Sequence, residues 1–219
     1  MIVVVEGPDG SGKSTLADAL AELFNGTVKK TSLSESFLPE AKKIFDSIAY
    51  DVPLARYVYY TAAAAYAARP EFKAETDDSV VIFDRYIYSG VATHTALETL
   101  RSGGKYVPVI DAIYNEVKER FAKPDAVIFL FIDERDRLAR LQRRDDATNI
   151  KLDFDRDFAS ITQEKFRKIA MELKKDGIPV LEINASANGT DQVRLQAKKF
   201  IASLKREKQK ICCDQYASK

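Results

Sequence analysis

Short apolar runs alternate with longer stretches of mixed polarity along most of this 219-residue chain. Within each run the apolar residues follow one another with few polar interruptions, which is typical of parallel strands that are covered on both faces. The predicted strands are residues 2–5, 27–31, 79–83, 126–132 and 178–183, of which 27–31 has the weakest pattern.

The stretches between these runs show helical periodicity. After the last run, Thr190 is suited to cap a helix, and Val193, Ala197 and Ile201 recur on one face of it. The predicted helices are residues 13–25, 38–49, 52–69, 107–122, 134–144, 153–175 and 190–205.

This alternation predicts an α/β fold, a doubly wound parallel sheet of about five strands flanked by helices. No linker, internal repeat or low-complexity segment interrupts the pattern, so we expect one domain over residues 1–205 and a polar C-terminal tail over 206–219. Ligands bind such sheets beyond the carboxyl ends of the strands, so the residues after each run are the candidates for a site.

The overall charge is nearly balanced, with 34 Lys and Arg against 33 Asp and Glu. It therefore gives no reason to expect a nucleic acid or a membrane surface as a partner. The longest weakly polar run, 57–68, is too short to span a bilayer. Because Cys212 and Cys213 are adjacent, they have poor geometry for a mutual disulfide. Glu6 interrupts the apolar start and no cleavage-type site follows, so residues 1–6 do not read as a secretory signal. We therefore expect reduced thiols and a cytoplasmic location.

A glycine-rich loop with the spacing G-x-x-x-x-G-K-S, residues 7–14, directly follows the first predicted strand. Its glycines let backbone N–H groups point at phosphate oxygens, and the next helix adds the positive end of its dipole. Lys13 is placed to reach the β- and γ-phosphates, and Ser14 to hold Mg²⁺. Since strand, loop and helix occur in the required order, a chance turn is a weak alternative, and we predict a nucleoside triphosphate site. The predicted nucleotide-binding residues are Gly7, Asp9, Gly10, Ser11, Gly12, Lys13, Ser14 and Thr15.

A second polar motif, Asp84-Arg85-Tyr86, comes directly after the predicted strand 79–83. An aspartate at a strand end near a phosphate-binding loop is suited to act on Mg²⁺ or its waters. The guanidinium of Arg85 matches the geometry of phosphate oxygens. A solvated pair at a strand end is the alternative interpretation.

With both motifs, the chain resembles the thymidylate kinase family of nucleoside monophosphate kinases. Residues 6–15 and 84–92 carry the resemblance, 123–125 and 183–186 are further landmarks, and it extends over about residues 1–205. It implies ATP- and Mg²⁺-dependent phosphorylation of a deoxynucleoside monophosphate, with dTMP as the default acceptor. It also implies a P-loop kinase architecture with a mobile lid, an acceptor-phosphate contact at Arg85, and metal and phosphate contacts at Asp84. Members are commonly homodimers, so a homodimer is one assembly that the resemblance allows.

In the family, arginines of the lid stabilise the transferring phosphoryl group. The matching region here is about residues 137–153, where Arg137, Arg140 and Arg144 share one helical face and Arg143 lies one position off. The phosphate-binding loop itself contains no arginine, so the lid arginines are expected to carry this role, although an ordinary basic helix face is the alternative. The predicted catalytic residues are Lys13, Asp84, Arg85, Arg140, Arg143 and Arg144, and the predicted metal ligands are Ser14 and Asp84.

The acceptor side departs from the family's pattern. The family's arginine that recognises the thymine ring is matched here by Ala64, while Tyr60 falls at an aromatic position that can stack on a base. For His94, the only histidine, a structural role is favoured over a substrate contact, and both stay open. Discrimination among bases is therefore expected to be weaker, or to be directed to another base. The predicted acceptor-binding residues are Asp9, Lys30, Tyr60, Arg85, Thr93 and His94.

Two other functions remain open at this stage. The first is a kinase of the same fold that acts on another or modified deoxynucleotide, or on a deoxynucleoside; the Asp-Arg-Tyr sequence argues against a nucleoside kinase, in which Glu-Arg-Ser is expected. The second is a nucleotide-binding module without kinase activity. A GTPase switch would need [NT]-K-x-D, but Ala122 precedes Lys123-Pro124-Asp125.

Overall fold

The computed structural model describes residues 1–30, 44, 47, 51–67, 79–143 and 154–217. Nearly all of the predicted helix 38–49 and most of the predicted lid, including Arg144, lie outside this part of the chain. Among the described residues, every helix is too short or too polar to cross a bilayer.

Five parallel strands form one sheet in the order β2-β3-β1-β4-β5, which confirms the predicted doubly wound sheet. In this register, Val5 and Lys30 both lie opposite Asp84, so three neighbouring strands end side by side at the carboxyl edge. The strand bounds are β1 Ile2–Glu6, β2 Thr27–Lys30, β3 Val81–Asp84, β4 Ala126–Phe131 and β5 Val180–Asn184.

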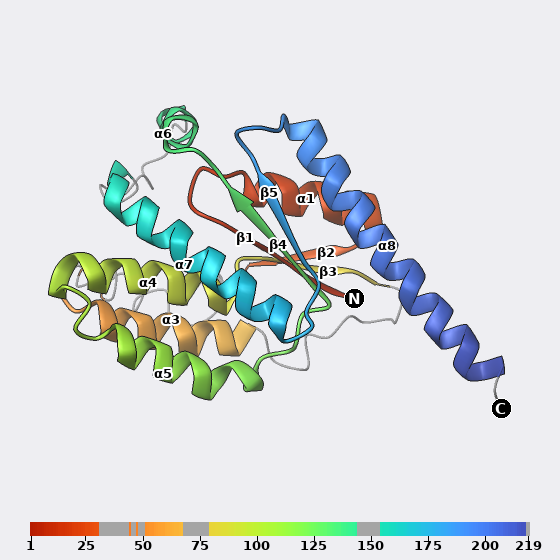
Figure 1. Cartoon of the computed structure of the whole chain (residues 1–219), viewed down its shortest axis with the longest axis horizontal. Helices are drawn as coiled ribbons and strands as arrows, with labels where there is room; N and C mark the ends of the chain where they lie inside the picture. The colour runs from red at the N-terminus through yellow and green to blue at the C-terminus, as the bar shows by residue number, and fades with distance from the viewer. Residues whose placement is uncertain (31–43, 45–46, 48–50, 68–78, 144–153, 218–219) are drawn as a thin grey trace.

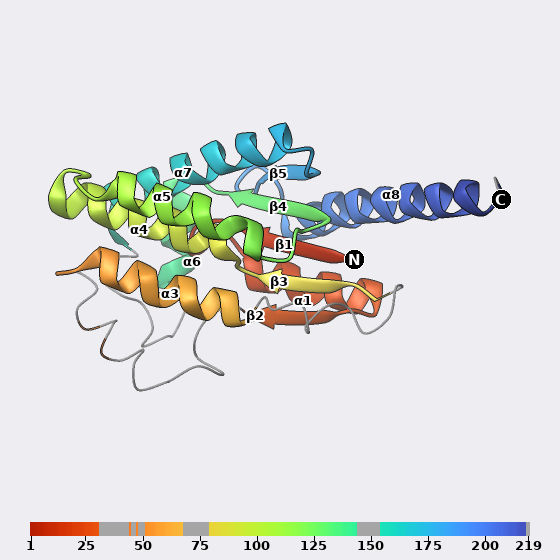
Figure 2. The same ribbon diagram turned by 90° about the horizontal axis from the view of Figure 1, so that it is seen from below.

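Helices cover both faces of the sheet (Figures 1 and 2). Alternate residues of β1 face opposite layers, because Val4 belongs to one buried cluster while Val3 and Val5 belong to the other. The cluster around Val3 and Val5 includes α1 Lys13–Phe24 and α8 Thr190–Ala217. The cluster around Val4 includes α3 Pro53–Ala67, α4 Ile87–Ser102, α5 Val107–Val117 and α7 Arg156–Lys175.

Two shorter helices complete the described chain. A 3₁₀ turn, Lys118–Arg120, ends the segment predicted as one helix at 107–122. Helix α6, Glu134–Gln142, follows β4 with two acidic residues in its first turn. Asp155 caps α7, since its Oδ1 accepts hydrogen bonds from the backbone N–H groups of Asp157 and Phe158 at 2.9 and 3.0 Å.

Helix α4 is absent from the helices predicted by periodicity, which is a correction to the sequence analysis. It packs between α3 and α7 and buries residues around most of its circumference, including the polar Ser89, His94 and Glu98. Such a helix has no simple division into an apolar and a polar face, so its periodicity is weak.

The helix predicted at 190–205 is longer than expected, because α8 continues to Ala217 and extends beyond the sheet (Figure 1). Residues 205–210 consist of Lys, Arg, Glu and Gln, which favour helix, and neither Gly nor Pro interrupts them. An ion pair between Lys208 and Asp125 ties the extension to the loop before β4. Cys212 and Cys213 lie in this helical extension.

Candidate active site

The glycine-rich loop wraps around the start of α1. Gly7, with φ of 147°, lies so close to β4 that a Cβ there would be 2.3 Å from the carbonyl oxygen of Leu130. Gly12 precedes the helix with φ of 97°, a left-handed conformation that side chains rarely adopt. These two positions therefore require glycine, and they turn the loop's backbone toward the helix N-terminus.

Lys13 is buried inside this loop. Its Nζ donates a hydrogen bond to the Pro8 carbonyl oxygen at 2.8 Å and lies 3.5 Å from Asp9 Oδ1. Burial, with a smaller contribution from the charge of Arg85, lowers the pKa of Lys13 to about 8. The loop's own oxygens thus hold the ammonium where phosphate oxygens of a nucleotide would take their place.

Asp84 ends β3 next to the loop and is 5% exposed. Its Oδ1 is buried and accepts no hydrogen bond from the residues that the structure describes. A carboxylate oxygen in this position suits Mg²⁺ or one of its waters. Ser14 lies at the exposed first turn of α1, and the described chain contains no cluster of three or more His, Cys, Asp or Glu for a metal. These residues fit Mg²⁺ that is held mainly by phosphates and water.

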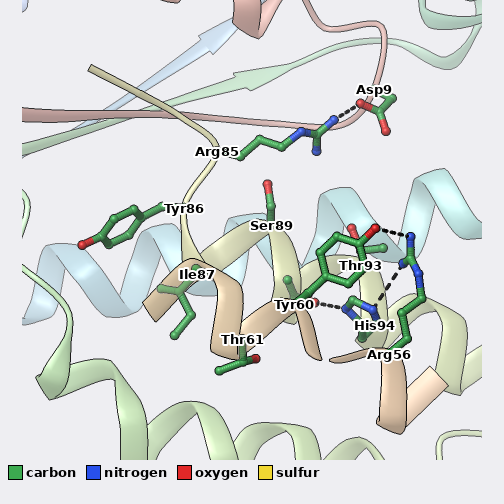
Figure 3. A pocket seen from close by; sticks show the side chains of 12 residues that line it. Asp9, Arg56, Tyr60, Thr61, Arg85, Tyr86, Ile87, Ser89, Thr93 and His94 are labelled. Atoms are coloured by element: carbon green, nitrogen blue, oxygen red, sulfur yellow. Dashed lines mark hydrogen bonds and ion pairs between the residues drawn. The ribbon is translucent and has the colours of Figure 1, made fainter. Parts of the chain in front are cut away.

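Arg85 is held in a strained backbone conformation, with φ of 75°. Such a conformation costs roughly 1–3 kcal/mol in a non-glycine residue and is common at functional sites. The guanidinium pairs with Asp9 of the glycine-rich loop, and the charge of Asp9 raises the pKa of Arg85 (Figure 3). This strained residue thus forms a contact that joins two predicted motifs.

Glu6, which the sequence analysis did not include in the site, holds the segment that follows Arg85. Its Oε1 accepts hydrogen bonds from the backbone N–H groups of Tyr86 at 2.7 Å and Ser89 at 3.1 Å, and its Oε2 accepts one from the Ser89 hydroxyl. Burial raises the pKa of this carboxyl to about 7. The acidic residue inside an otherwise apolar strand was the signal that could have identified it.

A cavity of about 230 Å³ opens beside Arg85, between α3 and the start of α4 (Figure 3). It brings together most of the predicted acceptor-binding residues. Those that line it are Asp9, Tyr60, Arg85, Thr93 and His94. Lys30 does not line it and is exposed at the end of β2, beside Asp84 in the register.

Beside Tyr60 in this cavity lies a residue that the sequence analysis missed, Arg56 (Figure 3). Its Nη1 lies 3.3 Å from His94 Nε2, and its Nη2 donates to the Tyr60 hydroxyl at 3.2 Å. The guanidinium carbon is 4.4 Å from the centre of the Tyr60 ring. Its spacing of four residues from Tyr60 on a predicted helix could have indicated this neighbour.

A second cavity, of about 250 Å³, opens on the other side of the glycine-rich loop, between the starts of α1 and α8. Gly12, Thr15 and Arg140 line it. Arg140 donates from Nη1 to the Ser11 carbonyl oxygen at 3.2 Å and from Nη2 to the Ala185 carbonyl oxygen at 2.8 Å. One guanidinium from α6 thus lies directly against the predicted nucleotide loop.

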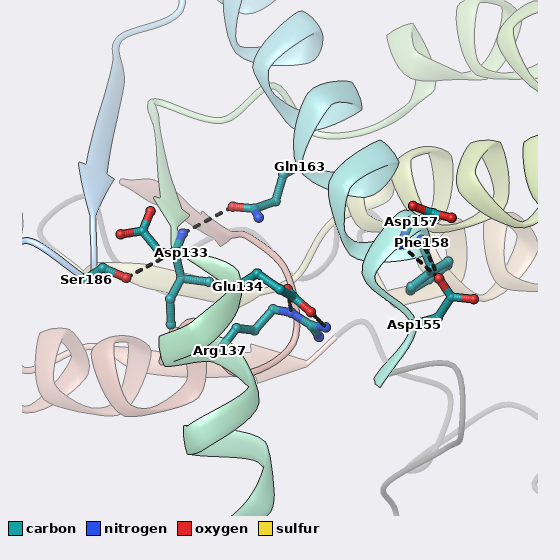
Figure 4. A network of polar contacts seen from close by, with 9 residues as sticks. Asp133, Glu134, Arg137, Asp155, Asp157, Phe158, Gln163 and Ser186 are labelled. Atoms are coloured by element: carbon teal, nitrogen blue, oxygen red, sulfur yellow. Dashed lines mark hydrogen bonds and ion pairs between the residues drawn. The ribbon is translucent and has the colours of Figure 1, made fainter.

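The other arginines of α6 are placed differently. Arg137 is 2% exposed and forms a forked ion pair with Glu134, at 2.6 and 2.8 Å, inside the same helix (Figure 4). Arg143 is exposed at the end of the helix, and Arg144 lies outside the described residues. Within the described part of the predicted lid, Arg140 is therefore the arginine whose guanidinium donates a hydrogen bond to the loop.

Comparisons with known proteins place the chain in a family. A family model described as thymidylate kinase matches residues 5–197. A protein of Saccharolobus solfataricus named probable thymidylate kinase 1 is 27% identical over 175 residues, covering 78% of this chain and 84% of the relative.

Two solved structures share the fold. The thymidylate kinase of Candida albicans has a TM-score of 0.70 and 22% identity, and the match covers 93% of this chain and 92% of that one. A deoxyadenosine kinase from M. mycoides with bound dCTP also has a TM-score of 0.70, at 14% identity, covering 93% of this chain and 100% of that one.

Proposed function

Because the chain belongs to the thymidylate kinase family and is a nucleoside monophosphate kinase, we propose that it phosphorylates dTMP to dTDP with ATP as donor and Mg²⁺ as cofactor. The observation that carries this proposal is the position of the Asp9–Arg85 ion pair. Asp9 and Arg85 line one cavity, and Gly10, Ser11 and Gly12 of the glycine-rich loop line the other. A donor and an acceptor nucleotide bound in these two cavities would have their phosphates meet at the loop.

On the donor side, the backbone N–H groups of residues 10–15 and the ammonium of Lys13 would hold the β- and γ-phosphates. Ser14 and Asp84 would hold Mg²⁺, which when bound neutralises charge on the donor phosphates. Arg140, already at the Ser11 carbonyl oxygen, would stabilise the negative charge of the transferring group.

On the acceptor side, Arg85 would orient the monophosphate. One of its oxygens attacks the γ-phosphorus, the bond from that phosphorus to the bridging oxygen breaks, and ADP leaves with the electron pair. A phosphate oxygen is already anionic at neutral pH, so this step requires no general base. Catalysis then rests on positioning and on charge, which are what Lys13, Arg85 and Arg140 supply.

The test is ADP release from ATP and Mg²⁺ with a panel of acceptors. We expect turnover with dTMP, and compare dUMP, dCMP, dGMP, dAMP and free thymidine under the same conditions. Turnover with thymidine but with none of the monophosphates would instead support a deoxynucleoside kinase. Nucleotide binding without any turnover would support a binding module.

A further inference from the structure

How the acceptor base is selected can be inferred if the proposed function holds. We propose that Arg56, held in place by His94, contacts the base edge farthest from the sugar and selects bases that present a carbonyl oxygen there. In pyrimidines the choice is between thymine or uracil, with a carbonyl at C4, and cytosine, with an amino group at C4.

The position of Arg56 in the cavity is the first argument. In the view of Figure 3, Arg85 and Asp9 lie above the Tyr60 ring, Arg56 lies beside its hydroxyl, and His94 lies below it. A monophosphate whose phosphate binds Arg85, and whose base enters the cavity beside Tyr60, would turn the far edge of its base toward Arg56. Because the sugar separates phosphate from base, this far edge is the one that carries the C4 substituent of a pyrimidine.

The spacing along α3 is the second argument. Arg56, Tyr60 and Ala64 are each four residues apart, so they lie along one face of the helix, and all three line the cavity. Ala64 offers a base no hydrogen-bond donor beyond its backbone, and its short side chain leaves room beside the Tyr60 ring. On this face of α3, the guanidinium in the cavity is that of Arg56, about two helical turns before Ala64.

His94 determines the orientation of this guanidinium. Its Nδ1 lies 2.7 Å from the carbonyl oxygen of Gly90, which can only accept, so Nδ1 carries the hydrogen. In the neutral ring Nε2 is then an acceptor, and it faces Arg56 Nη1 at 3.3 Å. Burial, together with the nearby charge of Arg56, keeps the ring neutral by lowering the pKa of His94 to about 3. His94 thus acts as a positioning residue for Arg56, consistent with the structural role favoured for it.

The chemistry of the guanidinium then sets the preference. Arginine has hydrogen-bond donors and no acceptor. A carbonyl oxygen at C4 accepts from it, whereas the amino group of cytosine would turn a donor toward a donor. A site built on such donors rejects a base that leaves them unpaired far more strongly than a site based on shape alone.

The experiment compares kcat/KM for dTMP and dCMP in wild type, four variants and one control variant. Arg56→Ala should lower kcat/KM for dTMP by about 10²-fold and change that for dCMP by less than about threefold, with the KM for ATP unaltered. Arg56→Lys keeps the charge and much of the packing but loses the planar, forked set of guanidinium donors. Its ratio of kcat/KM for dTMP to kcat/KM for dCMP should therefore fall between those of wild type and Arg56→Ala.

Two variants test His94. His94→Phe removes the acceptor and keeps an aromatic ring, so the dTMP/dCMP ratio should fall in the same direction as for Arg56→Ala. His94→Gln retains an acceptor for Arg56 and should keep a ratio nearer that of wild type. The matched control is Arg101→Ala, seven residues farther along α4 and exposed, which should leave the ratio unchanged.

The outcomes separate this inference from the proposed function. An equal loss for dTMP and dCMP in both Arg56 variants would make Arg56 a structural residue and overturn the inference, while dTMP turnover by the wild type would still support the proposed function. A wild-type enzyme that phosphorylates no monophosphate would overturn the proposed function itself. Melting temperatures of all variants identify any that fail to fold, and Arg56→Lys then decides in place of Arg56→Ala.

Discussion

Asp9 and Arg85 form an ion pair although 76 residues separate them in sequence. Asp9 belongs to the glycine-rich loop, and Arg85 follows β3 with a strained backbone. The contact places the acceptor-side guanidinium directly against the donor-side loop. Under the proposed function, an acceptor phosphate on Arg85 would share this guanidinium with Asp9 and so would lie beside the loop.

Lys13→Ala is expected to abolish phosphoryl transfer and to leave the fold intact. The lost ammonium would otherwise stabilise charge on the β- and γ-phosphates in the transition state, which corresponds to roughly 3 kcal/mol or more. Steady-state kinetics measures the effect, and circular dichroism checks the fold. A folded variant that keeps more than about a tenth of the wild-type kcat would contradict the assigned role.

Arg85→Ala should raise the KM for the acceptor and lower kcat, with little effect on the affinity for ATP. The reason is that Arg85 lines the acceptor cavity and is not among the residues that line the cavity at the start of α1. Alanine at position 85 would keep the strained φ of 75° unless the backbone moves, and a backbone movement could change the stability of the fold. The melting temperature of the variant should therefore be measured together with its kinetics. If the substitution weakened ATP binding alone, the acceptor-side placement would be wrong.

Asp84→Asn should lower kcat and shift the concentration of Mg²⁺ required for half-maximal activity. The buried Oδ1 lacks a hydrogen-bond donor among the described residues, and the charge of Asp84 acts on the nearby Lys13, so this oxygen is suited to bind Mg²⁺ or one of its waters. A titration of activity with Mg²⁺ measures the shift, with Arg85→Ala as the comparison. An unchanged Mg²⁺ dependence would remove Asp84 from the metal site.

His94 should make the stability of the protein sensitive to acid. In the unfolded chain its pKa is near 6.5, but in the folded protein burial lowers it to about 3. As the pH falls from about 6.5 toward 3, the unfolded state takes up a proton that the folded state does not, so the free energy of unfolding decreases. Urea denaturation at several pH values should show this decrease in wild type and a smaller one in His94→Gln.

The comparison isolates His94 because both proteins keep Glu6. The buried carboxyl of Glu6 has a pKa raised to about 7, so its contribution to stability is fully present below about 4.5 and is lost as the pH rises through 7. This opposing effect is the same in both proteins and cancels in their difference. Parallel stability curves for wild type and His94→Gln would show that the histidine titrates normally.

The sequence by itself determined the sheet and the motifs at its carboxyl edge. Runs such as 126–132 are apolar because both faces of β4 are covered. The burial of this strand can therefore be predicted from the local sequence. The glycines at positions 7 and 12 are required by the path of the loop, and a local spacing therefore identifies them. Lys13, Asp84 and Arg85 were placed at one edge because parallel strands all end there.

Only the tertiary structure decided which side chains share the site. Helix α4 has no clear apolar stripe because it is packed between two other helices. Arg137 and Arg140 look equivalent on a helical wheel, although the guanidinium of Arg137 pairs with Glu134 and that of Arg140 donates to the Ser11 carbonyl oxygen. Arg56 reaches the acceptor cavity because α3 packs against α4 and brings it to His94. Such contacts join residues far apart in the chain, so their geometry depends on packing that local periodicity does not record.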